Sequence, residues 1–512
     1  MNVWRFAFRG VFEGARRRLL TFWRMTTPEH DAGKLSSLDA GLHPGSKSKE
    51  PGSHLRIGLL TPYGGTNLGD GAIQTAVIEG IRRQLPGVEL WGITLNPAET
   101  ARRHGIRAFP ITGLLMPFYS ETLFDPIRGL SVRFQTKSGL GENADNGEAV
   151  WSCSRDYGRL RQHLKKVPAL GRTLKFLVNP LRKGFAVVHE IRHLGTSFHF
   201  VRTLDMVMVS GGGQLDESWG RAWGHPYALF RWAVLARLAG KQFVIVSVGV
   251  DEVRTKLCRY FTRIALSLAS YRSYRDLVSK KLLEQWTFTK NDAYVPDLAF
   301  GLCVPEGTLP LLENGHPVIV GISPMAYGRY GSWPKPAPAV YSEYLSCLAK
   351  FVAFLAGNGC RVILFTTSGT DRAAIEDLQA MIIERWPVGI MDKVSAPINE
   401  TVEELLQEVR KVDFVVASRL HGVILSHILG KPVLAISYDR KVGTHMQDVG
   451  QGRYLLELSN INSTELTACF QSLVGNAQES RKEVRKHILC FRKSIEKQYE
   501  HLAQILRVAR ST

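Results

Sequence analysis

Residues 415–427 of this 512-residue chain read VVASRLHGVILSH. An apolar, β-branched run ends at Ser418, and an apolar set at helical spacing, Leu420, Ile424 and Ile428, follows directly. Continuous β-branched runs without alternation are typical of parallel strands that are covered on both faces. The stretch therefore predicts a buried parallel strand that turns at once into a helix.

The same pattern occurs along most of the chain. Short apolar runs that end in glycine, proline or polar loops lie at residues 56–60, 205–210, 243–247, 318–322, 361–365, 414–417 and 433–437. Helical patterns separate many of these runs, which is typical of parallel α/β sheets. The chain is also too long for one ordinary core. We therefore expect two parallel-sheet α/β domains.

Composition and spacing divide the chain into four parts. Residues 1–54 form a basic extension and a Gly/Ser/Pro/Lys-rich linker. Residues 55–305 form the first domain, with a basic insertion at about 115–203. Residues 306–460 form the second domain, and residues 461–512 form a basic helical segment.

The charge balance favours anionic partners. The chain has 65 Lys and Arg against 46 Asp and Glu, a net charge of +19. Phosphates, nucleotide sugars, nucleic acid and anionic membranes all suit such a charge. The sequence has no basic-aromatic RNA-binding signature and no zinc-finger spacing, so we expect no nucleic-acid partner and no metal.

Cysteine usage and hydropathy indicate a cytoplasmic protein. The seven cysteines are scattered and never in C-x-x-C spacing, which is typical of reduced thiols. No stretch reaches the ~20 uncharged apolar residues of a membrane span, and the N-terminus has no secretory pattern.

The N-terminal extension has the pattern of an amphipathic helix. Its bulky residues Trp4, Phe8, Phe12, Leu19 and Trp23 recur near helical spacing, and arginines lie largely between them. Such a helix favours an anionic membrane interface, which would place the protein peripherally on the inner face of the cytoplasmic membrane. The alternatives are a helix that docks on the protein itself or on a partner, and a misassigned start.

Two glycine-rich loops follow predicted strands of the first domain. The loop at residues 62–71 is neither a dinucleotide fingerprint nor a Walker motif. Its Asn67, Gly69 and Asp70 are candidates for contacts with a sugar or with the donor substrate of a group transfer. The alternative is that the loop is only a tight strand-to-helix turn. In the second loop, Gly212 and Gly213 would let a ligand approach the backbone, or would serve only as a turn.

The start of the helix at Leu420 is the sharpest candidate site. Arg419 and His421 lie where a guanidinium, free N–H groups and the helix dipole all favour an oxyanion. The alternative is that Arg419 pairs with a carboxylate and His421 merely packs. Lys441 follows the next predicted strand on the same rim, and a solvated charge is its alternative.

These residues resemble the polysaccharide pyruvyltransferase family. The matches are Asn67-x-Gly69-Asp70, Ser210-Gly-Gly-Gly213, Ser247-x-Gly249, Tyr274-Arg275-Asp276 with Ser279, Pro296-Asp297-x-Ala299-Phe300, Ser418-Arg-Leu-His-Gly422 and Ser437-Tyr-Asp-x-Lys441. Each motif is short, but their order and spacing over about residues 56–455 are specific.

The resemblance implies a fold and an activity. The fold would be GT-B-like, with two Rossmann-like domains facing a cleft and a C-terminal helix crossing back. The activity would be transfer of a pyruvyl group from phosphoenolpyruvate to a sugar of a surface or exopolysaccharide precursor, forming a ketal. The Arg-Leu-His motif, Arg419, Leu420 and His421, would lie at the donor.

Roles follow from the chemistry of that donor. Arg419 and Lys441 would hold its phosphate and carboxylate, and His421 would be the acid. Asp70 is the candidate base, and no cofactor is required. The acceptor would be a glycan or a lipid-linked sugar. The alternatives are a GT-B glycosyltransferase that uses a nucleotide sugar, and a catalytically silent membrane-associated scaffold of glycan assembly.

Overall fold

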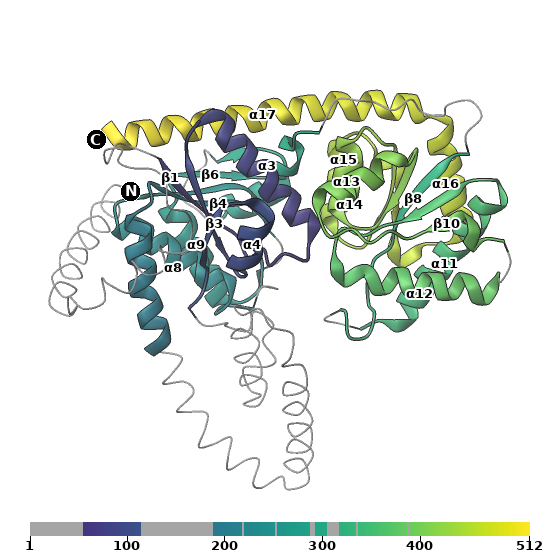
Figure 1. Ribbon diagram of the computed structural model, residues 1–512, viewed down its shortest axis with the longest axis horizontal. Helices are drawn as coiled ribbons and strands as arrows, with labels where there is room; N and C mark the ends of the chain where they lie inside the picture. The colour runs from purple at the N-terminus through teal and green to yellow at the C-terminus, as the bar shows by residue number, and fades with distance from the viewer. Residues whose placement is uncertain are drawn as a thin grey trace, which may run out of the picture.

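The computed structural model shows two α/β bodies side by side, with one long helix, α17 (Ala477–Ser511), running along both (Figure 1). The structure describes residues 55–113, 188–217, 220–250, 253–286, 292–304, 317–333, 336–386 and 389–511. The predicted N-terminal helix and linker, and most of the predicted basic insertion, lie outside these residues.

The first sheet has seven parallel strands in the order β3-β2-β1-β4-β5-β6-β7. The strands are β1 (Arg56–Leu60), β2 (Glu89–Thr94), β3 (Arg107–Pro110), β4 (Met206–Leu215), β5 (Gln242–Val250), β6 (Tyr271–Tyr274) and β7 (Ala293–Tyr294). The helices with them include α3 (Leu68–Gln84), α4 (Pro97–His104), α8 (His225–Leu238), α9 (Lys256–Leu268) and α10 (Leu277–Glu284). The strand order reverses between β1 and β4, and ligands of such sheets bind beyond that point.

The second sheet has six parallel strands in the order β10-β9-β8-β11-β12-β13. The strands are β8 (Ile319–Ser323), β9 (Arg361–Leu364), β10 (Val394–Ser395), β11 (Phe414–Ala417), β12 (Val433–Ser437) and β13 (Leu455–Glu457). The helices with them are α11 (Pro338–Gly357), α12 (Arg372–Arg385), α13 (Val402–Lys411), α14 (Leu420–Ile428), α15 (Arg440–Asp448) and α16 (Ser463–Gly475). Its order reverses between β8 and β11, so α14 begins at the point where a ligand is expected.

The apolar runs became strands because both faces of each sheet are covered. Every residue of β11 and of β12 is buried, and both strands have the predicted bounds. The turn directly into α14 is confirmed as well. One described helix, α11, is long and apolar enough to cross a membrane, with a mean hydropathy of 1.3, but 56% of that window is buried inside the protein.

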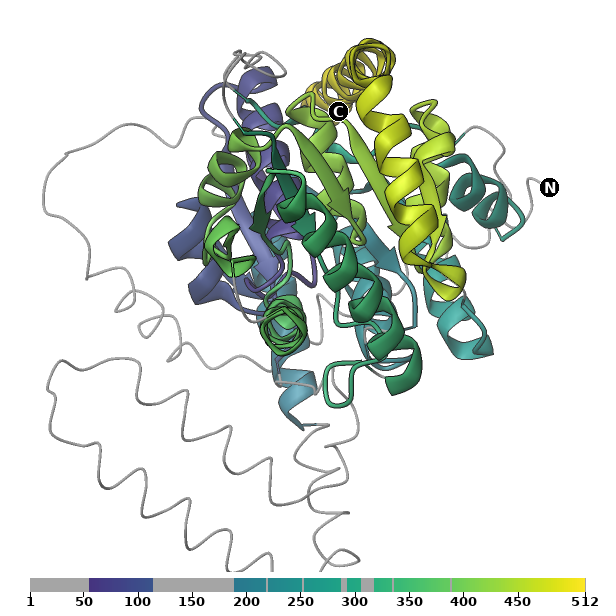
Figure 2. The same ribbon diagram turned by 90° about the vertical axis from the view of Figure 1, so that its right-hand side faces the viewer.

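Helix α17 joins the two halves (Figures 1 and 2). In the first half, Gln498 Nε2 donates to Ser247 Oγ at 3.1 Å, and Gln498 Oε1 accepts from the Tyr271 hydroxyl at 3.0 Å. In the second half, Arg481 Nε donates to the Gly430 carbonyl at 2.8 Å. Two Rossmann-like parallel-sheet domains with a C-terminal helix crossing both confirm the expected fold class.

Candidate functional site

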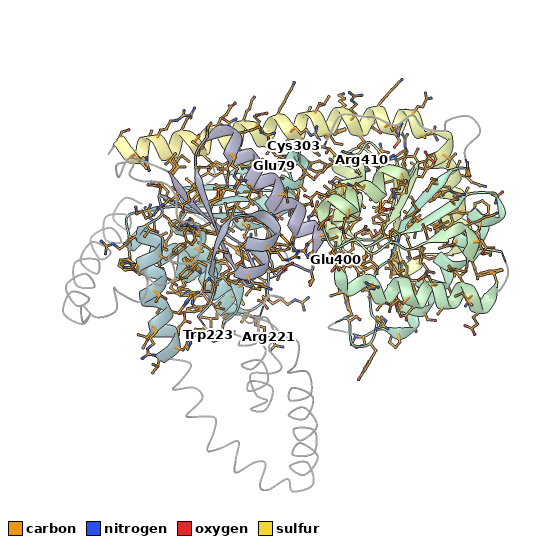
Figure 3. All side chains as sticks on the ribbon, in the orientation of Figure 1. Glu79, Arg221, Trp223, Cys303, Glu400 and Arg410 are labelled. Atoms are coloured by element: carbon orange, nitrogen blue, oxygen red, sulfur yellow. The ribbon has the colours of Figure 1, made fainter. Side chains whose placement is uncertain are left out.

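Backbone hydrogen bonds hold the two domains together beside the carboxyl ends of their strands. The loop after β1 meets the loop after β9: Leu68 N–H donates to the Thr367 carbonyl at 2.8 Å, and Gly369 N–H donates to the Thr66 carbonyl at 2.9 Å. Nearby, the side-chain guanidinium of Arg103 donates to the backbone carbonyl of Glu400, which Figure 3 labels at the junction. The start of α3 is therefore fixed against the second domain.

Asn67 builds the start of α3. Its Oδ1 accepts from the N–H groups of Gly69 at 3.0 Å and Asp70 at 3.4 Å, so Asn67 is the N-cap. Its Nδ2 donates to Asp70 Oδ2 at 2.8 Å. In the structure, Asn67 thus caps the helix and aims the Asp70 carboxylate.

The starts of α3 and α14 touch through Gly69 and His421. A Cβ on Gly69 would lie 2.3 Å from His421 Nδ1, so only glycine lets the ring pack there. The His421 side chain is 12% exposed, and its Nε2 lies 3.8 Å from Asp297 Oδ2, too far for a hydrogen bond. The buried Nε2 has no hydrogen-bond partner among the described residues.

The predicted glycine turn forms part of β4 and lies close to the charged side chains of Asp70, Arg275 and Lys441. Gly211 and Gly212 have φ of +67° and +78°, in the left-handed region that favours glycine. A Cβ on Gly212 would lie 3.8 Å from Asp70 Oδ1, and one on Gly213 would lie 3.7 Å from both Arg275 Nη2 and Lys441 Nζ. A guanidinium and an ammonium thus converge over Gly213.

Arg275 was not among the predicted site residues. It follows β6, and its Nη1 donates to Asp297 Oδ2 at 3.0 Å in a pair whose side chains are 6% and 5% exposed. Its guanidinium lies against the backbone of Gly249, where a Cβ would come within 2.4 Å of Nε. The motif Tyr274-Arg275-Asp276 at a strand end was the available signal.

The two carboxylates of the site are tuned in opposite directions. Burial raises the pKa of Asp70, against the opposing effect of His421, Arg275 and Lys441. Burial would also raise the pKa of Asp297, but the His421 ring at 3.8 Å, the charge of Arg275 and the hydrogen bond from the Ala299 N–H hold that pKa below its usual range. Asp297 therefore stays anionic, and Asp70 binds a proton more readily than an ordinary aspartate.

Arg419 occupies separate surroundings. Its Nε and Nη2 donate to the two carboxylate oxygens of Asp371 at 2.7 and 2.8 Å, and Asp371 is fully buried. The guanidinium carbon also lies 5.5 Å from the ring centroid of Trp333 and 6.0 Å from that of Tyr438. The structure therefore shows the carboxylate pairing that the sequence left open for Arg419.

A pocket between the domains is lined by several of the remaining candidate residues. Asp439 caps α15 by accepting from the Lys441 N–H at 2.8 Å, which sets the Lys441 backbone at this helix start. The described lining includes Arg275, Asp297, Leu420 and Lys441, together with Phe491 of α17. Lys441 and Leu420 thus share this pocket. His421, which packs on Gly69, is linked to the lining through Asp297, 3.8 Å from its Nε2. Among the described residues, no group of three or more His, Cys, Asp or Glu could hold a metal ion.

Solved structures resemble the chain at low identity. The Anabaena protein HepE, in complex with UDP and glucose, has a TM-score of 0.46 and 12% identity over 90% of this chain and 100% of its own. A glycosyltransferase from Rickettsia africae has a TM-score of 0.45 and 9% identity over 88% and 98%. UDP-GlcNAc 2-epimerase from Methanocaldococcus jannaschii has a TM-score of 0.45 and 9% identity over 89% and 100%.

Sequence comparison identifies the family. A search of curated protein sequences finds no match. The sequence profile of the family described as polysaccharide pyruvyl transferase matches residues 67–440. That range begins at the N-cap of α3, contains the glycine turn and the start of α14, and covers most of the chain. The family that the motifs resembled is confirmed: this chain belongs to the polysaccharide pyruvyl transferases.

Proposed function

We propose that this protein transfers the pyruvyl group of phosphoenolpyruvate to a sugar of a surface or exopolysaccharide precursor, forming a pyruvate ketal. The observation that carries the proposal is the convergence of Arg275 and Lys441 over Gly213, beside His421 and Asp70. Phosphoenolpyruvate has a phosphate and a carboxylate, so a site for it needs at least two cations. Membership of the family supports the transfer activity.

The donor is held by Lys441 and Arg275, which suit its two anionic groups. A guanidinium has five N–H donors, so Arg275 can keep its bond to Asp297 and still bind an oxyanion. Leu420 supplies an apolar wall in the same pocket. Arg419 is engaged by Asp371, and we assign it the role of holding the start of α14, with a direct donor contact as the alternative.

The reaction needs an acid at the donor methylene. Protonation of that carbon by His421 makes the neighbouring carbon an oxocarbenium-like centre, which one sugar hydroxyl attacks. The carbon–oxygen bond to phosphate breaks, and a second hydroxyl closes the ketal. Of the two hydroxyl protons, one restores His421 after the methyl group has formed, and the other leaves on phosphate.

The electrostatics of the two carboxylates suit these steps. An anionic Asp297 is the partner that a protonated His421 ring requires where both side chains are largely buried. Because the pKa of Asp70 is raised, that carboxylate can accept the proton of one hydroxyl during attack and pass it to the departing phosphate, so that Asp70 ends the reaction in its starting state. We propose Asp70 as this base, acting beside Gly212.

The acceptor is a glycan or a lipid-linked sugar, and the proposed location is the cytoplasm, at the inner face of the cytoplasmic membrane. The test is to incubate the purified protein with phosphoenolpyruvate and candidate lipid-linked oligosaccharides, and to follow phosphate release and the mass of the glycan. We expect a pyruvyl ketal on the glycan, and its loss in Lys441→Gln but not in Lys411→Gln, an exposed control. Release of UDP from UDP-sugars with no ketal would refute the proposal in favour of a glycosyltransferase.

A further inference from the structure

We propose that the outward face of α17 docks on an anionic membrane surface. This α17 outer face consists of Lys482, Arg485, Lys486, Leu489, Lys493 and Lys497. The inference does not depend on the transferred group, because it concerns a surface outside the pocket.

Helix α17 has two different sides. Its inner side is buried against both domains through residues such as Val484, Ile488, Ile495 and Leu502. Side chains on the other side project away from both domains (Figure 3). At about 1.5 Å per residue, the 35-residue helix offers a straight edge of roughly 50 Å. A straight, rigid edge suits a flat partner.

The outer face carries cations that the protein does not neutralise. All five of its Lys and Arg residues are exposed, and none forms an ion pair or a side-chain hydrogen bond with another described residue. Between Lys482 and Lys497 the one exposed carboxylate is that of Glu496, since Glu483 is half-buried and accepts from Gln451.

Other helices of the protein pair their surface charges. Lys411 lies 2.6 Å from Glu408 on α13, and Arg102 lies 2.8 Å from Glu99 on α4. Such pairs at spacings of three and four residues are the usual arrangement on a solvated helix. The five cations of the α17 outer face form no such pair with another described residue. This favours a partner that supplies the negative charge.

An exposed leucine favours lipid over other polyanions. Leu489 is 51% exposed and lies between Lys486 and Lys493 in the middle of the face. An apolar side chain among cations can enter the headgroup region while the cations contact lipid phosphates. The phosphates of a nucleic acid would bind the cations but would provide no apolar contact for Leu489.

Docking on this face would also place the pocket near the membrane. Phe491 belongs to the same helix, and its ring centroid lies 5.0 Å from that of Phe300. Both phenylalanines line the pocket between the domains. The helix, about 10 Å across with its side chains, would then separate the pocket from the lipid surface.

The test uses the full chain and vesicles of phosphatidylcholine with or without phosphatidylglycerol. One variant reverses the five charges by Lys482→Glu, Arg485→Glu, Lys486→Glu, Lys493→Glu and Lys497→Glu. The matched control makes the same charge change at exposed positions off α17, by Arg202→Glu, Lys256→Glu, Lys281→Glu, Lys350→Glu and Arg361→Glu. Co-sedimentation measures the partition coefficient at two salt concentrations, and circular dichroism confirms that each variant is folded.

We expect the α17 variant to lose roughly 100-fold or more of its partition into anionic vesicles at low salt, because each basic residue near such a surface contributes several-fold. The control should stay within a few-fold of the wild-type protein, and Leu489→Ser should weaken partition with an unchanged salt dependence. Undiminished vesicle binding by the α17 variant, or an equal loss in the control, would overturn the proposal. A parallel measurement with polyuridylate, a single-stranded RNA, tests the other polyanion: a variant that loses RNA binding while keeping vesicle binding would also overturn it. Phosphate release with a soluble acceptor should be unchanged in the α17 variant, which separates this outcome from failure of the proposed function.

Discussion

Gly69→Ala should displace His421 and reduce turnover. The new Cβ would lie 2.3, 2.4 and 2.5 Å from Nδ1, Cγ and Cβ of His421, and real Cβ contacts do not fall below 3.0 Å. Because His421 Cβ is among these atoms, rotation of the ring cannot relieve the overlap, and the starts of α3 and α14 must separate. Overpacking of this kind costs about 1–3 kcal/mol. The better helix propensity of alanine returns at most about 1 kcal/mol.

The displacement matters more for activity than for folding. Moving a catalytic group by about 1 Å can cost on the order of 100-fold in rate. We therefore expect a loss near that size in phosphate release from phosphoenolpyruvate, with a loss of only about 1–2 kcal/mol in urea unfolding. Gly64→Ala is the control, because it lies in the same loop and its added Cβ would meet nothing within 4 Å. Equal turnover in the two variants would refute the account of how His421 is placed.

Three further changes test other parts of the site. Arg419→Ala leaves the fully buried Asp371 without its cationic partner, so the free energy of unfolding in urea should fall by about 3–5 kcal/mol. Adding Asp371→Asn should restore part of that free energy. An unchanged free energy of unfolding in Arg419→Ala would show that the pair does not hold α14. His421→Gln should lower turnover by about 100-fold or more while phosphoenolpyruvate affinity, measured by calorimetry, stays within a few-fold; near-normal turnover would remove the acid role. Burial raises the pKa of Asp448 from 3.8 to about 6. Its contribution to the free energy of unfolding is therefore complete below the lower pKa and is lost as pH rises through the higher one. Between those two values the free energy of unfolding in urea should fall less in Asp448→Asn than in the wild-type protein, and parallel pH profiles would contradict this.

The sequence predicted the central strands well because their signal is local. Strands β11 and β12 are buried on both faces, so each appears as a continuous apolar run between polar residues. The edge strands β7 and β10 have only two residues each and form no such run. Whether so short a segment becomes a strand depends on the neighbour that it meets, which the sequence does not show.

In the candidate site, the positions of the helix starts could be predicted from the sequence, and the ion pairs could not. Asn67 and His421 lie beside glycines at strand-to-helix turns, which is a local pattern. The partners Asp371 of Arg419 and Asp297 of Arg275 come from other loops, and only the folded sheets bring them together. For the same reason the sequence could not show that Gly69 makes room for the ring of His421.

Calorimetric titration with phosphoenolpyruvate tests the central claim most directly, because it measures whether the cations over Gly213 bind this donor. The account predicts saturable binding by the wild-type protein and by Lys411→Gln. Lys441→Gln should bind at least about 10-fold more weakly, since it removes one charge-assisted contact. The account would be contradicted if the wild-type protein did not bind phosphoenolpyruvate, or bound it no more tightly than Lys441→Gln does, while it bound a UDP-sugar tightly.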